Sequence, residues 1–114
     1  MTKKRPVAAV TFAIAVAFPA VALAQGSVRI TAPVDGATLG AMTENKLTYE
    51  VDPGPTGDHV HIYVDGEEVG ILRQLKGSYV LERLAPGSRT LCVKVVNKGH
   101  TPIGVEECVR VTVR

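Results

Sequence analysis

The sequence contains no tryptophan, and aromatic residues of all kinds make up only 4% of its 114 residues. An antibody-type immunoglobulin domain has a tryptophan packed against a disulfide that joins its two sheets. The lack of tryptophan therefore argues against an antibody-type domain, but it leaves other β-sandwiches open.

Cysteine is equally scarce, since Cys92 and Cys108 are the only two. Their spacing does not fit a C-x-x-C redox pair, and two cysteines are too few for a cysteine-rich zinc site. In an oxidising compartment the pair is expected to form a disulfide, which a domain of about 90 residues needs because its apolar core is modest.

The long apolar run that the sequence does have lies at its beginning. Lys3, Lys4 and Arg5 precede an uncharged stretch from Val7 to Ala22, and Ala22-Leu23-Ala24 supplies small residues for signal peptidase. We expect residues 1–24 to be a cleaved Sec-type signal peptide and residues 25–114 to form one domain, periplasmic or secreted. An uncleaved membrane anchor is the alternative, but the run is short against the roughly 20 residues of a membrane span.

Charge of one sign is also lacking once this signal is set aside. The chain has 13 basic and 11 acidic residues, and three of the basic ones lie in the signal, so the remainder has 10 basic and 11 acidic residues and a net charge of −1. No electrostatic case for nucleic-acid binding is left, and we expect no membrane contact after cleavage.

Helical periodicity is missing after Gln25, where no amphipathic helical pattern exceeds about two turns. Short β-rich runs separated by Gly, Pro, Asp and Asn take its place. They predict strands at 27–31, 46–51, 59–65, 68–73, 78–84, 90–96 and 105–113. About seven short antiparallel strands are typical of an all-β immunoglobulin-like or fibronectin type III-like sandwich.

The last two strands are expected to form a hairpin whose register the cysteines set. If Cys92 faces Cys108, the residue numbers of every cross-strand pair sum to 200, which places Lys94 opposite Glu106 and makes His100 the centre of the turn. Parity then puts both cysteines on one face, as a cross-strand disulfide requires. Residues 97–104 would form the tip.

Three histidines follow the signal, and the expected topology brings them to one end of the sandwich. His59 and His61 share a face of one strand, opposite Val60, Ile62 and Val64, so this is the outer face. In an immunoglobulin-like sandwich that strand begins beside the tip of the last hairpin, where His100 lies. Neutral imidazole suits Cu(II) and Zn(II), so the trio is a candidate metal site, with Asp58 as a possible extra ligand.

The alternatives are that these histidines are incidental surface residues and that the domain has no metal. It would then be a protein- or glycan-interaction module that uses loops 52–58 and 97–104. An enzyme is not expected: no serine lies in a nucleophile-elbow context, and Glu106 and Glu107 point to opposite faces of a strand.

Four segments carry a resemblance to known proteins: Ala32–Thr38, Asp58–Gly66, Leu84–Leu91 and Asn97–Pro102. They resemble a group of small exported bacterial immunoglobulin-like domains of unknown function that have a histidine-rich strand. The chain departs from the group at Arg89, where a histidine often stands. Secreted copper-resistance β-sandwich proteins are a looser analogy, which implies copper rather than zinc, although a Met-rich or N-terminal His feature is missing.

The sequence thus predicts a small exported binding domain whose partner is a metal ion or another periplasmic protein. As a metal protein it would be a copper carrier or resistance factor that holds Cu(II), or else Zn(II), through His59, His61 and His100.

Overall fold

The structure, a computed structural model, describes residues 26–114. The expected signal peptide at 1–24 and the residue after it, Gln25, lie outside the described residues. The described part forms no helix that is long and apolar enough to cross a membrane.

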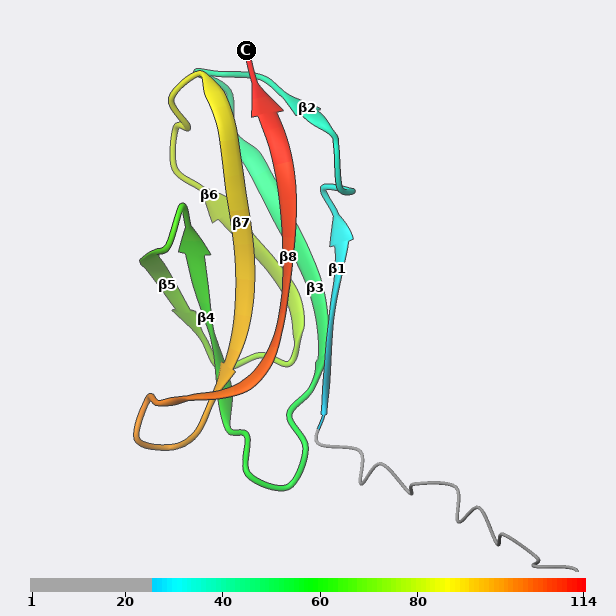
Figure 1. Ribbon diagram of the computed structural model, residues 1–114, viewed down its shortest axis with the longest axis vertical. Helices are drawn as coiled ribbons and strands as arrows, with labels where there is room; N and C mark the ends of the chain where they lie inside the picture. The colour runs from blue at the N-terminus through cyan, green and yellow to red at the C-terminus, as the bar shows by residue number, and fades with distance from the viewer. Residues whose placement is uncertain (1–25) are drawn as a thin grey trace, which may run out of the picture.

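Within residues 26–114, eight strands form two sheets that pack face to face, as expected for an immunoglobulin-like or fibronectin type III-like sandwich (Figure 1). The three-stranded sheet has the order β1-β3-β6, and the five-stranded sheet has the order β2-β8-β7-β4-β5. The strands are β1 (Ser27–Ala32), β2 (Thr38–Leu39), β3 (Asn45–Asp52), β4 (His59–Val64), β5 (Glu67–Leu72), β6 (Lys76–Leu81), β7 (Gly87–Val96) and β8 (Pro102–Val113).

All seven predicted strands are present, and most of their ends agree within a few residues. The structure adds β2, which the sequence did not reveal because two residues carry no alternating pattern. This strand pairs in parallel with β8, where Thr38 lies opposite Thr112. The strand predicted at 78–84 is β6, which ends at Leu81. Leu84 is buried, but it lies in the connection to β7.

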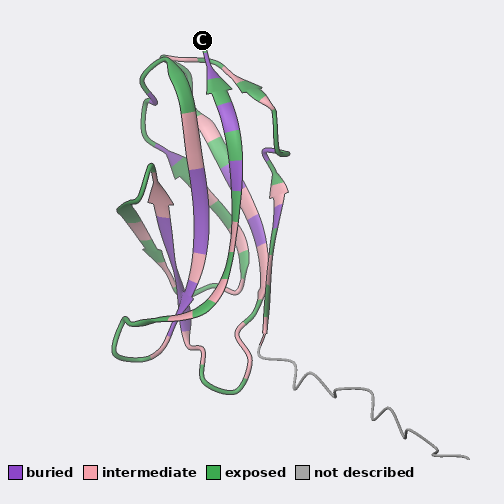
Figure 2. Ribbon diagram, in the orientation of Figure 1, coloured by how far each residue is buried: buried purple, intermediate pink, exposed green. Residues whose placement is uncertain are grey.

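The core lies between the sheets and is built from alternate residues of the central strands. Leu47 and Tyr49 of β3 have no exposed surface, and neither do Val60 and Ile62 of β4. Figure 2 shows buried stretches in the central strands of both sheets. Because side chains alternate along a strand, the burial of Val60 and Ile62 leaves His59 and His61 on the opposite face of β4.

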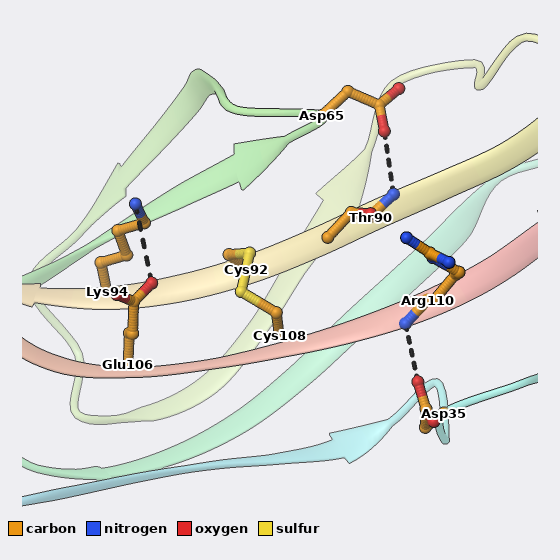
Figure 3. The surroundings of a disulfide bond; sticks show 8 residues. All are labelled: Asp35, Asp65, Thr90, Cys92, Lys94, Glu106, Cys108 and Arg110. Atoms are coloured by element: carbon orange, nitrogen blue, oxygen red, sulfur yellow. Dashed lines mark hydrogen bonds and ion pairs between the residues drawn. A yellow bond between two sulfur atoms is a disulfide. The ribbon is translucent and has the colours of Figure 1, made fainter.

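The β7–β8 hairpin has the register that the cysteines predicted. Cys92 faces Cys108, Thr90 faces Arg110, and Lys94 faces Glu106. The two cysteines form a disulfide within one sheet (Figure 3), as in proteins outside the reducing cytoplasm. The Lys94 ammonium and the Glu106 carboxylate, which are drawn in the same figure, form an ion pair 3.6 Å apart.

The register changes near the tip of this hairpin, and there the expectation was wrong. Val96 pairs with Pro102, so β8 begins at Pro102 and the tip is residues 97–101 rather than 97–104. Gly104 has a φ of 88°, which a residue with a side chain rarely adopts, and it lies in the stretch of β8 where the register shifts.

Tyr49 offers a test of the core. Its hydroxyl donates a hydrogen bond of 2.7 Å to the carbonyl oxygen of Gln74, and burial raises the pKa of the phenol. We expect Tyr49→Phe to lower the free energy of unfolding by about 1 kcal/mol, because it removes this bond and leaves the ring in place. Chemical denaturation measures the loss. Tyr79→Phe, which removes an exposed bond of the same length from a partly buried ring, is the matched control and should cost less.

Candidate metal centre

Three histidines meet at one end of the five-stranded sheet. His59 and His61 lie on β4, which runs between β5 and β7, and His100 lies in the loop that joins β7 to β8. In Figure 1 this loop passes beside the beginning of β4, at the same end as the loop of residues 53–58. The topology therefore brings together residues that are about 40 positions apart in the sequence.

The ring nitrogens of the trio form a small triangle. Nε2 of His59 is 3.2 Å from Nε2 of His61, and each of these atoms is 3.0 Å from Nδ1 of His100. The three nitrogens are thus within contact distance of one another, and each ring offers one of them. The predicted convergence of His59, His61 and His100 is present in the structure.

The pair on β4 is more enclosed than the sequence suggested. Both histidines lie on the outer face of the sheet, as expected, but His59 has 0% and His61 4% of its surface exposed. The reason is tertiary: the tip of the β7–β8 hairpin folds beside the pair and brings His100 against both rings. His100 itself is exposed.

Each buried histidine has a carboxylate on its second ring nitrogen. Asp58 Oδ2 is 2.9 Å from Nδ1 of His59, and Glu68 Oε1 is 2.6 Å from Nδ1 of His61. Carboxylates accept hydrogen bonds, so they favour a proton on each Nδ1. These contacts orient the rings and direct both Nε2 atoms toward the triangle, as carboxylate partners do for histidines that bind metals.

Protons on both Nδ1 atoms would make the triangle a potential cation-binding site. A neutral imidazole carries one N–H, and the carboxylates assign it to Nδ1 in both His59 and His61. Their Nε2 atoms then present two lone pairs that face each other at 3.2 Å. Two acceptors at this distance repel, unless a proton or a metal ion lies between them and the nitrogen of His100.

The pKa of His61 lies below its ordinary value. Burial of the ring is the largest cause, because it disfavours the charged imidazolium; the Glu68 carboxylate acts in the opposite direction, and the neighbouring His59 and His100 lower the pKa further. His61 is therefore held in the neutral form, the form that can coordinate a metal.

Asp58 supports the ring of His59 and does not join the triangle. The hydrogen bond with His59 is the largest cause that lowers the pKa of its carboxyl, and the charges of Arg73 and Lys98 act in the same direction. Arg73 Nη1 is 3.4 Å from Asp58 Oδ2. Asp58, which the sequence offered as a possible extra ligand, thus lies at Nδ1 of His59, the ring nitrogen outside the triangle.

Glu68 is the member of the site that the sequence analysis did not identify. Its signal lay in the Asp65-Gly66 turn, which predicts the β4–β5 hairpin. In that hairpin Tyr63 pairs with Glu68. Tyr63 shares its face with His61, so Glu68 is a diagonal neighbour of His61 and reaches its ring.

His100 is presented by a turn built around Asn97. The backbone N–H of His100 donates to the carbonyl oxygen of Asn97 over 2.9 Å, and the N–H of Thr101 donates to the side-chain oxygen of Asn97 over 3.0 Å. His100 has a φ of 64°, in the left-handed region. The backbone of the tip therefore aims the third imidazole at the other two.

The triangle suits one metal ion of the first transition row. With their ring nitrogens 3.0–3.2 Å apart, His59, His61 and His100 would each supply one imidazole nitrogen to a single ion. Such a three-nitrogen cap leaves coordination positions for water or another ligand.

The remaining acidic and sulfur groups do not take part. Asp52, at the same end of the fold, accepts a hydrogen bond from the N–H of Gly54 and so holds its own loop. Cys92, Cys108 and Glu106 form a second group of potential ligand atoms. Both thiols of that group are consumed by the disulfide, so it offers no thiolate.

No protein-family profile and no curated protein matches the sequence. Solved structures do match. A fibronectin(III)-like module of CbhA from Clostridium thermocellum has a TM-score of 0.64 and 21% identity over 76% of this chain and 95% of that one.

A CARDB domain of Pyrococcus furiosus, solved in complex with di-metal ions, has a TM-score of 0.57 and 13% identity over 78% of this chain and 87% of that one. A lytic polysaccharide monooxygenase of Jonesia denitrificans has a TM-score of 0.51 and 18% identity over 72% of this chain and 60% of that one. At such identities the likeness concerns the fold alone. The chain is thus an all-β sandwich similar to immunoglobulin-like and fibronectin type III-like modules, and it carries a cluster of two buried histidines and one exposed histidine.

Proposed function

We propose that this protein is an exported domain that binds one divalent transition-metal ion through Nε2 of His59, Nε2 of His61 and Nδ1 of His100. It would carry or sequester the ion in the periplasm or outside the cell. The observation that supports this proposal best is the triangle of nitrogens, 3.0–3.2 Å apart, with the opposite nitrogens of the two buried rings held by carboxylates.

Copper is the metal that we expect to bind most tightly. The donors are three neutral imidazole nitrogens, which suit Cu(II) and Zn(II) better than Mg(II) or Ca(II), the ions that prefer oxygen ligands. At a given nitrogen site Cu(II) binds more strongly than Zn(II) in the Irving–Williams order. Asp58 and Glu68 would strengthen the site as outer-shell partners that fix the ring orientations.

Location outside the cytoplasm is supported by two independent features. The Cys92–Cys108 disulfide requires an oxidising compartment to persist, and residues 1–24 have the sequence pattern of a signal peptide. The role we propose is binding rather than catalysis, because the described cluster offers ligands for an ion but pairs no nucleophile with a base.

Titration of the purified, metal-stripped protein with Cu(II) and Zn(II) at neutral pH tests the proposal. We expect saturable binding of one ion, tighter for Cu(II). His59→Ala should lose more than about 100-fold in affinity, because loss of an outer-shell partner alone typically costs 10- to 100-fold and His59 would be a direct ligand. Tyr63→Phe is the control, since Tyr63 shares the face of β4 with the histidines.

Binding that does not saturate, or equal binding by wild type and His59→Ala, would contradict a metal-carrying role. The loops around the cluster would then be candidates for docking a protein or a glycan.

A further inference from the structure

The three proposed ligands differ in how firmly the fold holds them. His59 and His61 have 0% and 4% exposed surface and lie on a strand with neighbours on both sides. Each is fixed at its second nitrogen by a carboxylate, Asp58 or Glu68. Neither ring can turn away without breaking its hydrogen bond to a carboxylate.

His100 is the ligand that can leave. It is exposed and lies at the tip of a hairpin, outside the ladder of β7 and β8. Among residues 26–114, no carboxylate pairs with its ring. A rotation of its side chain would open the triangle on the solvent side and leave His59 and His61 in place.

The approach to His100 is positively charged once a divalent ion is bound. Three neutral imidazoles cancel none of the ion's charge. Arg73, whose side chain is 70% exposed, lies 3.4 Å from Asp58, and Lys98 is exposed two residues before His100. Glu68 and Asp58 offset part of this charge, but both are engaged with histidine rings. An anionic ligand is therefore attracted to this side of the site.

We propose that the bound metal is released by ligand exchange at His100, in which a small polycarboxylate acceptor takes the place of His100 before His59 and His61 let go. This inference rests on the proposed function. In the first step the bond between the metal and Nδ1 of His100 breaks and a metal–carboxylate oxygen bond forms. The freed imidazole stays neutral, and the metal keeps its oxidation state.

The rate law for metal transfer tests this sequence of steps. The Cu(II)-loaded protein is mixed with increasing concentrations of nitrilotriacetate, and transfer is followed by the change in visible absorption as copper passes from the protein to nitrilotriacetate. We expect the rate to rise in proportion to the nitrilotriacetate concentration. A rate that does not change with its concentration would overturn the proposal, because the ion would then leave before the acceptor arrives.

The charge of the acceptor is a second arm of the experiment. Triethylenetetramine, a polyamine that is cationic at neutral pH, should remove copper several-fold more slowly than nitrilotriacetate at equal concentration. Lys98→Ala should slow transfer to nitrilotriacetate about two- to fivefold. Lys46→Ala is the matched control, because it removes the same charge from an exposed position on β3 in the other sheet. Equal effects of the two lysine variants would contradict an anionic acceptor at this site.

Ligand variants compare the two kinds of histidine. His100→Gly suits the φ of 64° and removes only the exposed ligand. We expect it to keep a copper ion on His59 and His61 with weaker affinity, and to transfer that ion to nitrilotriacetate faster than wild type does. His61→Ala should lose more affinity than His100→Gly, because it removes a buried and anchored ligand. An equal loss in both variants would contradict the asymmetry.

These measurements separate the two proposals. A protein that takes up no Cu(II) in the titration fails as a metal carrier. A protein that binds one Cu(II) but releases it at a rate independent of the acceptor retains the proposed function, and only the exchange at His100 is overturned.

Discussion

Acidification from about pH 7.5 to about pH 5 is expected to weaken Cu(II) binding by at least about tenfold. A protonated imidazole cannot coordinate a metal. The imidazole group in general has a pKa of about 6.5, so protons compete with the metal for imidazole nitrogens over this pH range. Titration calorimetry at a series of pH values measures how the affinity changes with pH, with the copper concentration kept low enough to prevent precipitation as hydroxide.

His61 is expected to contribute less to this loss than an exposed histidine, because burial lowers its pKa and keeps the ring neutral further into the acid range. An affinity that does not change across this pH range would show that imidazoles are not the ligands.

The lowered pKa of His61 also affects the metal-free protein. Because the folded state binds a proton less readily than the unfolded chain, the contribution of His61 to stability is complete above about pH 6.5. It is lost as the pH falls from there through the lowered pKa of the folded protein. Denaturation of metal-free wild type and His61→Gln between about pH 7.5 and pH 5 should therefore show a smaller acid loss in the variant.

Removal of the disulfide is expected to cost about 3 kcal/mol of folding free energy. Cys92 and Cys108 are separated by 16 positions, and a loop of this size restrains the unfolded chain by about that amount in the chain-entropy model. Replacement of both cysteines by alanine should lower the thermal midpoint by roughly 12–25 °C for a domain of this size. Calorimetry under non-reducing conditions measures the change.

The same double variant should bind copper more weakly. The disulfide joins the two strands of the β7–β8 hairpin (Figure 3), and the tip of that hairpin carries His100. The nearby ion pair between Lys94 and Glu106 cannot replace the disulfide, since both side chains are partly exposed and such pairs contribute under about 1 kcal/mol. Lys94→Ala is therefore the control within the hairpin, with a small expected effect. An unchanged midpoint in the double cysteine variant would show that the sheet alone fixes the hairpin.

Much of this fold could be predicted because its signals are local or are set by one covalent link. Alternating apolar residues in Lys46–Val51 identified β3, and the cysteine pair gave the register of Lys94 against Glu106. β2 could not be predicted, because its two residues form a strand only where the edge of β8 lies beside them. The early start of β8 at Pro102 depends likewise on a register shift that no local pattern shows.

The candidate site divides in the same way. The three histidines and their convergence at one end followed from parity along β4 and from the expected topology. The burial of His59 and His61 did not follow, because it depends on how the tip at 97–101 folds beside β4. The role of Glu68 was missed because its partner His61 lies on the neighbouring strand, across an irregular register.

By itself the sequence determined an all-β chain with a hairpin closed by Cys92 and Cys108 and a set of histidines on strand and turn, because periodicity, turn residues and cysteine spacing act over short distances. Only the tertiary structure decided which nitrogens of His59 and His61 face the cluster, since that depends on Asp58 and Glu68 arriving at the opposite nitrogens. It also decided that His59 and His61 are buried while His100 is exposed. Both properties arise from contacts between segments far apart in the chain, and sequence patterns do not record such contacts.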